Sequence, residues 1–203
     1  MCSYFSLNSL LSYTLFLNII SVMELNFGEI DAWEQRKLGE IANRFDNLRI
    51  PVTASDRIAG TTPYYGANGI QDYVEGFTHK GEYVLIAEDG ANDLINYPVQ
   101  YVNEKIWVNN HAHVIQGIDR VSDNKFLMNA IKSINIEPFL VGGGRAKLTS
   151  NTLMKLPVKI PTFLEQKKIG TFFQQLDNTI TLHHSKIEKL TTLKKAYLKN
   201  LFI

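Results

Sequence analysis

The 203-residue sequence predicts an α+β fold, in which a mixed, mostly β domain is followed by one long C-terminal helix. Short apolar runs typical of strands occupy most of the chain, and YVLIA, residues 83–87, is the clearest of them. From Ile169 onward, apolar residues recur instead every three or four positions, which is the period of a helix. With 45% hydrophobic residues, the chain can bury a substantial core.

Residues 1–22 are an apolar extension that we treat as separate from the fold. The stretch has no preceding basic residue and no small-residue cleavage pattern, so a secretory signal is not indicated, and a membrane anchor stays open as an alternative. Residues 23–161 are expected to form the mixed domain and residues 162–203 the long helix. The single cysteine, Cys2, excludes an internal disulfide and suits a reducing cytoplasm.

The first half of the domain is expected to contain a short helix and then strands. In residues 31–45, apolar side chains recur at spacings of three to five, which favours an amphipathic helix. The pair Asn68 and Gly69 tolerates positive φ, which predicts a tight turn that leads into a strand over residues 70–74. The continuous apolar run of residues 83–87 predicts a buried strand.

The second half of the domain is expected to continue with strands and to end in a helix. Residues 98–115 predict a hairpin that turns near residues 103–105, with a second polar break at Asn109 and Asn110. Residues 123–135, DNKFLMNAIKSIN, then shift to helical spacing. One helix is therefore expected before the proline that follows.

The end of the chain predicts one uninterrupted helix of up to about 40 residues. Thr162 and Glu165 have the spacing of a capping box, which satisfies free backbone N–H groups at a helix start. The apolar stripe beyond them has alternating steps of four and three, so it predicts a coiled coil, with a helix folded back on its own domain as the alternative. The expected helix-pairing residues are Ile169, Phe173, Leu176, Ile180, Ile187, Leu190, Tyr197 and Leu201.

Charge divides the chain at the same place as the predicted elements. Residues 24–161 carry 14 Lys and Arg against 17 Asp and Glu, net −3, whereas residues 162–203 carry 7 Lys against 3 acids, net +4. This balance gives no global attraction to nucleic acid or membrane, so a polyanion would have to meet a local patch. The stretch between Pro138 and Leu164 contains no acidic residue and is the best candidate.

The sequence GGGRAKLT, residues 142–149, is the most distinctive part of that acid-free stretch. A nucleotide-binding P-loop needs a lysine that directly follows a glycine and precedes Ser or Thr, and this order is absent here. The glycines instead allow the backbone to approach a surface closely, and Arg145 and Lys147 can contact phosphates. An ordinary solvated loop is the alternative.

Other polar clusters do not complete an active site. His111 and His113 alternate on an expected strand, but two ligands without a third do not predict a zinc site, and no metal is expected. Asn109, Asn110 and His111 can instead present donors and acceptors to base edges. The acids within residues 88–93 are expected to be turn residues.

Several segments resemble, in this order, the specificity subunit of type I restriction-modification systems. They are WEQRKLGEIA, TPYYGANGIQDYV, VLIAEDGAN, VNNHAHVI, FLVGGGRAKLT and LPVKIPTFLEQKKIGTFFQQLDNTI, and the resemblance covers residues 32–203. It implies a target recognition domain that reads half of a bipartite DNA site. It also implies that the long helix is a spacer and a docking surface for methyltransferase subunits.

The resemblance also implies which chemistry belongs to other chains. Methyl transfer from S-adenosylmethionine, and translocation with cleavage that use ATP and Mg²⁺, belong to the modification and restriction subunits. This chain is therefore expected to bind double-stranded DNA without being an enzyme and without a cofactor of its own. Neither a glycine-rich S-adenosylmethionine motif nor an NPPY-type motif occurs in the 203 residues.

One departure from the family pattern predicts pairing. A full specificity subunit carries two recognition domains and two antiparallel helices, whereas this sequence has one of each and is similar to the C-terminal half. We expect the helix to pair, as an antiparallel coiled coil, with a second copy or another specificity half, so that two domains read a palindromic bipartite site. A silent or truncated cassette, and a coiled-coil adaptor anchored by residues 1–22, stay open as alternatives.

Turns and loops are expected to make the DNA contacts. Tyrosines would offer aromatic faces, asparagines and a histidine would bond to bases, and glycines and cations would approach phosphates. For each tyrosine, a place in the core is the alternative. The predicted DNA-binding residues are Tyr64, Tyr65, Asn68, Gly69, Asn109, Asn110, His111, Gly143, Gly144, Arg145 and Lys147.

Overall fold

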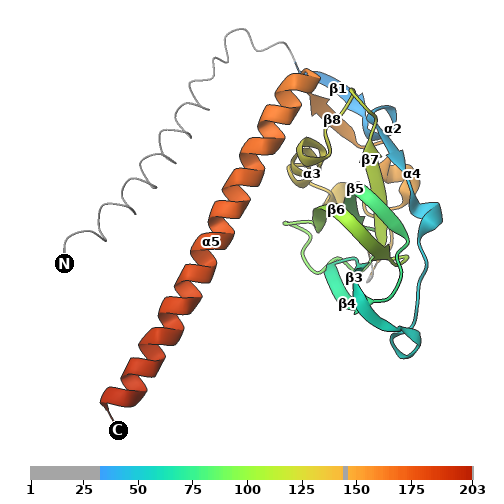
Figure 1. The fold of residues 1–203 in the computed structure, drawn as a ribbon. Coiled ribbons are helices and arrows are strands. Elements are labelled where there is room, and N and C mark those ends of the chain that lie inside the picture. Colours follow the sequence, from blue (N-terminus) through green and yellow to red (C-terminus); the bar gives the residue numbers. More distant parts are fainter. Residues whose placement is uncertain (1–32, 144–145, 203) are drawn as a thin grey trace. The chain divides into compact units, whose positions relative to one another are not determined.

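The structure is a computed structural model that describes residues 33–143 and 146–202. A strand-rich domain is followed by the long helix α5, Phe163–Leu201 (Figure 1). The predicted α+β fold class is therefore confirmed. The expectations for residues 1–22, Gly144 and Arg145 concern positions outside the described residues.

The larger sheet has six strands in the order β2-β7-β5-β6-β3-β4. All neighbours are antiparallel except β3 and β6, which run parallel where Tyr64 pairs with Trp107 and Tyr65 with Val108. The strands are β2 (Ala42–Arg44), β3 (Ala59–Gly66), β4 (Gly69–Val74), β5 (His79–Ala87), β6 (Val99–Val108) and β7 (Ala112–Gly117).

A separate two-stranded sheet joins the two ends of the domain. Strand β1, Glu34–Lys37, pairs antiparallel with β8, Pro157–Ile160, so that α5 begins directly after a strand held by the first described segment. The remaining elements are α2 (Leu38–Ile41), η1 (Asp46–Leu48), η2 (Ala54–Asp56), α3 (Asn124–Lys132), η3 (Glu137–Phe139) and α4 (Ser150–Leu153).

The core lies on both faces of the larger sheet. On one face, Val84 and Ile86 of β5 pack in a cluster that includes Phe126 and Ile131 of α3. Tyr83, Leu85 and their neighbours belong to a second cluster with residues of β6 and β7. A strand buried on both faces needs a continuous apolar run, which is why residues 83–87 predicted it correctly.

Three further predictions are confirmed at the level of elements. The helix α3 lies where the helical spacing placed it, and the Asp123 side chain caps it by accepting from the backbone N–H of Phe126. The capping box of Thr162 and Glu165 opens α5. A tight turn does precede β4, but its two loop residues are Ala67 and Asn68, one position earlier than the expected pair, and of Asn68 and Gly69 only Gly69 has a positive φ, 114°.

The helix predicted for residues 31–45 is wrong. Residues 34–44 form β1, a single helical turn and β2, and Leu38 and Ile41 are the buried residues of that turn. The two strands pair with β8 and β7, which lie far away in the sequence. Tertiary strand pairing has therefore overridden a local helical pattern.

The hairpin predicted to turn near residues 103–105 is also wrong. Strand β6 passes straight through these residues, and Asn103 pairs with Glu82 and Glu104 with Gly81. Their side chains are exposed, so the polar residues mark a solvated part of the strand and no turn. The polar break after β6 does end it, but β5 separates β6 from β7, so these two strands form no hairpin.

The first turns of α5 are anchored to the domain. The buried Gln166 side chain donates to the carbonyl groups of Val121 and Pro161 and accepts from the N–H of Asp123. At Gly170 the helix is so close to α3 that an added Cβ would lie 2.9 Å from the backbone nitrogen of Phe126. Among residues 33–143 and 146–202, no helix combines the length and apolar character required to cross a bilayer.

Candidate nucleic-acid interface

Hydrogen bonds join four segments of the domain into what we call the loop cluster, which consists of residues 67–69, 88–92, 109–111 and, from the last segment, the described residues 141–143, 146 and 147. The turn before β4 is tied to the segment after β5. The amide nitrogen of Asn68 donates to the carbonyl of Gly90 over 2.9 Å, and the amide oxygen of Asn68 accepts from the N–H of Asn92 over 2.9 Å. Asn68 is exposed, whereas Gly69 is buried.

The segment between β6 and β7 joins the same cluster. Asn109 is only 4% exposed, and its oxygen accepts from the N–H of His111 over 2.8 Å. The N–H of Asn109 donates to the carbonyl of Tyr65, and the imidazole of His111 pairs with the Asp89 carboxylate. Asn110 is exposed between them.

Backbone pairing holds the fourth segment in place. Val141 and Lys147 exchange two hydrogen bonds of 2.9 Å, and the N–H of Leu148 donates to the carbonyl of Glu88 over 2.7 Å. Glycine is required at Gly142, where φ is 98°, whereas a Cβ on the exposed Gly143 would meet nothing within 4 Å.

The two tyrosines belong to the core, which was the alternative expectation for them. Tyr64 is 1% exposed, its hydroxyl bonds to the backbone of Val52, and Arg57 covers its ring at 4.1 Å. Tyr65 is 6% exposed. Both rings are therefore largely covered by the protein, and neither has an open face on which a base could stack.

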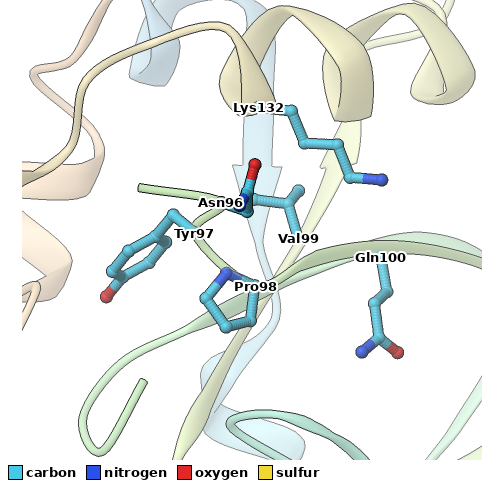
Figure 2. Close-up of a pocket in the computed structure, with 6 residues that line it drawn as sticks. All are labelled: Asn96, Tyr97, Pro98, Val99, Gln100 and Lys132. Atoms are coloured by element: carbon cyan, nitrogen blue, oxygen red, sulfur yellow. The ribbon is translucent and has the colours of Figure 1, made fainter. Parts of the chain in front are cut away.

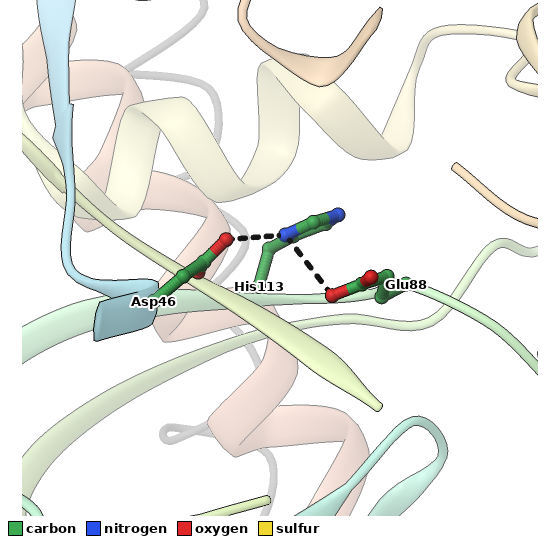
Figure 3. A group of neighbouring side chains, drawn as sticks. All are labelled: Asp46, Glu88 and His113. Carbon is green, nitrogen blue, oxygen red and sulfur yellow. Dashed lines mark hydrogen bonds and ion pairs between the residues drawn. The ribbon is translucent and has the colours of Figure 1, made fainter. Parts of the chain in front are cut away.

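A network of charged side chains lies beneath the loop cluster. Figure 3 shows His113 between Asp46 and Glu88, with its Nδ1 atom 2.7 Å from Asp46 Oδ2 and 3.6 Å from Glu88 Oε2. Arg49 approaches Glu88 Oε2 to 2.6 Å, and Lys147 Nζ lies 2.7 Å from Glu88 Oε1. The predicted phosphate contact Lys147 is therefore paired with an internal carboxylate.

The same three residues have the composition of a metal site. One ligand atom from each of Asp46, Glu88 and His113 lies within 4.8 Å of the others. However, both Glu88 oxygens already accept from cations, and Asp46 accepts from His113 and from the N–H of Val114. The arrangement thus fits an ion-pair network better than a cation site.

Local contacts keep both carboxylates ionised. Burial alone would raise the pKa of Asp46, but hydrogen bonds from His113 and Val114 and the charges of His113 and Arg49 lower it overall. Burial likewise opposes ionisation of Glu88, yet hydrogen bonds from Lys147 and Arg49 lower its pKa. The two acids therefore carry negative charge at neutral pH.

The sequence did not predict that Asp46 and Arg49 belong to this network of charged side chains. It placed His113 on a strand but gave no role to Asp46 or Arg49, because a short polar stretch after an expected helix carries no recognisable signal. Their importance arises from η1, which brings them against β7, more than sixty residues away in the sequence.

A pocket of about 350 Å³ lies beside the loop cluster and is lined by residues 96–100 and Lys132 (Figure 2). Of the six described residues that line it, Lys132 is the charged one. The Tyr97 hydroxyl donates to the carbonyl of Ala87, and burial together with the charges of Asp89 and Glu88 raises its pKa to about 12. The described residues of this lining therefore contain no acid and base pair suited to catalysis at neutral pH.

The predicted helix-pairing residues divide into two groups. Ile169 packs against the domain core, and Leu176 is half-buried. The others expose large apolar side chains along α5. Their exposed fractions are 41% for Phe173, 53% for Ile180, 60% for Ile187, 55% for Leu190, 59% for Tyr197 and 72% for Leu201.

The structure thus combines a strand-rich domain, in which four loop segments are joined, with a long helix that exposes an apolar stripe. The chain belongs to the family of type I restriction modification DNA specificity domains, whose model matches residues 30–192. It is 49% identical, over 67% of its length, to a Haemophilus influenzae protein named as a type I restriction enzyme specificity subunit. Identity to the EcoprrI specificity subunit of Escherichia coli is 23% over 68% of the chain.

The match extends over only part of each relative. The chain spans about a third of the two curated relatives, 35% and 32% of their lengths. In fold, it is similar to a type I restriction-modification S subunit from M. genitalium, with a TM-score of 0.67, 19% identity, and coverage of 93% of this chain and 50% of that one.

Proposed function

We propose that this chain reads one half of a bipartite target in double-stranded DNA and directs partner subunits to it. Family membership supports DNA recognition, and the loop cluster supports its location. The main supporting observation is that residues far apart in the sequence lie close together in the structure. Segments separated in sequence bring Asn68, Asn110, His111, Gly143 and Lys147 to one group of hydrogen-bonded loops.

The proposed contacts divide by chemistry. The exposed amide of Asn110 and the partly exposed imidazole of His111 suit base edges, because both offer directional hydrogen bonds. Lys147 and the open backbone at Gly143 suit phosphates, which accept from any nearby donor. The two tyrosine rings are buried and are therefore left out of the contact set.

The helix α5 carries the second part of the proposal. Its exposed apolar stripe joins the chain to a second copy, or to another specificity half, and provides a surface for modification subunits. Methyl transfer from S-adenosylmethionine and the ATP- and Mg²⁺-dependent restriction reactions belong to those partners. This chain contributes recognition in the cytoplasm and no catalytic step.

Selection from a random-sequence duplex library by the purified chain tests the recognition part directly. We expect enrichment of a short motif, and Asn110→Ala should change the bases preferred or abolish the preference. Asn103→Ala is the matched control, because this asparagine is exposed on β6 and lies outside the four segments of the loop cluster. Retention of duplexes without any enriched motif would contradict the proposal.

A further inference from the structure

We propose that Glu88 is an intramolecular substitute for a DNA phosphate, which holds Lys147 in the free protein and lowers the affinity of the chain for DNA of arbitrary sequence. The inference rests on the proposed function, because it assigns the regulation of one of its phosphate contacts. The sequence alone predicted Lys147 as a free cation. On this account its ammonium group is available to DNA only after it leaves Glu88. This control of Lys147 by Glu88 is called the gate.

The two carboxylate oxygens of Glu88 pair with different cations, and one of these cations is more buried than the other. Oε2 accepts from Arg49, whose side chain is 15% exposed, and Oε1 pairs with Lys147, whose side chain is 45% exposed. Glu88 itself is 11% exposed. Arg49 is therefore the inner cation of the pair and Lys147 the outer one, on the side open to solvent.

If Lys147 left Glu88, another cation would still balance the negative charge of the buried Glu88 carboxylate. Arg49 would remain on Oε2, with His113 Nδ1 at 3.6 Å from the same oxygen. Arg49 is fixed by its own bonds to the carbonyls of Asp46 and Ala112. An uncompensated buried charge is the main cost of breaking such a pair, and the inner cation removes that cost.

Only the lysine side chain has to move in the exchange. The backbone of Lys147 is paired with Val141, and the backbone of Glu88 is bonded to His111 and Leu148. Lysine carries its charge on a flexible four-carbon stem, so its ammonium group can turn from the carboxylate to a phosphate while the loops keep their conformation.

The exchange has a quantitative consequence for binding to mixed-sequence DNA. While the pair is closed, a loosely held duplex gains nothing from Lys147. A free lysine would add one phosphate contact, which steepens the salt dependence by about 0.9 in log Kobs against log[salt] and corresponds to about fivefold in affinity at 0.15 M salt. By holding Lys147, Glu88 thus weakens binding to the many DNA sites that lack the target sequence.

The test measures Kd for a mixed-sequence duplex over a salt series with the full chain and its Glu88→Gln, Lys147→Ala and doubly substituted variants. We expect Glu88→Gln to tighten binding about fivefold and to steepen the salt slope by about 0.9. Lys147→Ala alone should change Kd less than about twofold, and in the Glu88→Gln background it should abolish the gain.

Each other outcome has a distinct meaning. An equal gain from Glu88→Gln with and without Lys147 would show a general loss of repulsion and would overturn the gate. A loss of fivefold or more from Lys147→Ala alone would overturn it too, and this arm stands even if Glu88→Gln fails to fold. Absence of DNA binding by the unsubstituted chain would instead refute the proposed function, and the gate with it.

Discussion

His113 illustrates how a single buried residue organises the loop cluster. Its ring is fully buried, with Nδ1 facing the carboxylate of Asp46 and Nε2 facing the carbonyl oxygen of Leu148 over 2.8 Å. A backbone carbonyl only accepts, so Nε2 carries a proton and donates it. The residue thus links η1, β7 and the backbone at Leu148.

Because of the two carboxylates in this network, the free energy of unfolding should decrease at acidic pH. The pKa values of Asp46 and Glu88 are lowered in the folded protein, so the unfolded chain binds more protons as the pH falls. Their contribution is present above the ordinary carboxylate pKa of about 4 and is lost as the pH falls through the lowered values. Thermal melting between pH 7 and pH 3 should show this decline.

The Asp46→Asn variant isolates that contribution. At pH 7 it should cost about 3 kcal/mol in the free energy of unfolding, because a buried histidine and arginine lose their carboxylate partner. Its melting temperature should then fall less than that of the unsubstituted protein between pH 5 and pH 3. An equal fall in both proteins would assign the acid sensitivity to other groups.

At the scale of elements, the start of α5 depends on close approach to α3. An added Cβ at Gly170 would lie 2.7 Å from Asp123 Oδ1, 2.9 Å from Lys125 Cβ and 2.9 Å from Phe126 N. All three atoms belong to the capped start of α3, where the Asp123 side chain accepts from the N–H of Phe126, so they cannot move freely. The glycine therefore serves packing, although it weakens the helix intrinsically.

Gly170→Ala should destabilise the protein by about 1–3 kcal/mol through overpacking. Helix propensity alone would stabilise the same change by about 1 kcal/mol, so the sign of the effect separates the two causes. Gly143→Ala is the matched control, because its Cβ meets nothing within 4 Å, and it should stay within about 0.5 kcal/mol. Urea denaturation measures both, and a more stable Gly170→Ala protein would disprove the close packing.

The exposed stripe of α5 should determine the oligomeric state. An apolar stripe of this length is stabilised by burial against a partner helix, so we expect twice the chain mass by light scattering at micromolar concentration. Replacing Ile187 and Leu190 by Glu should give a monomer. Replacing Thr181 and Thr192 by Glu adds the same charge on the opposite side of the helix and should leave the dimer intact. A monomeric unsubstituted protein would contradict the pairing.

At the scale of the whole molecule, local signals predicted the elements whose causes are local. The helix α3, the capped start of α5 and the buried strand β5 each follow from a period or a cap within one segment. The β1 and β2 segments were misjudged because Glu34 pairs with Ile160 and Arg44 with Ile115, and no local pattern carries that information.

The candidate site was predictable in outline for a similar reason. Polar turns and glycines mark where strands end, so three of the four loops could be chosen from the sequence. The fourth segment, residues 88–92, was expected only as a turn, and its hydrogen bonds join the described residues of the other three. The burial of each side chain could not be predicted from the sequence. Tyr64, Tyr65 and Asn109 lie inward, and Lys147 is engaged by Glu88, because strand register and remote partners set these positions.

Mapping methylated bases across a genome tests the central claim most directly. The chain would be co-expressed with the methyltransferase subunits of its own system in a host without other modification, and compared with the same host lacking this chain. We predict methylation at a bipartite motif only when the chain is present, with palindromic halves if two copies pair. An identical methylation pattern with and without the chain, despite folded protein and active methyltransferase, would contradict its role in recognition.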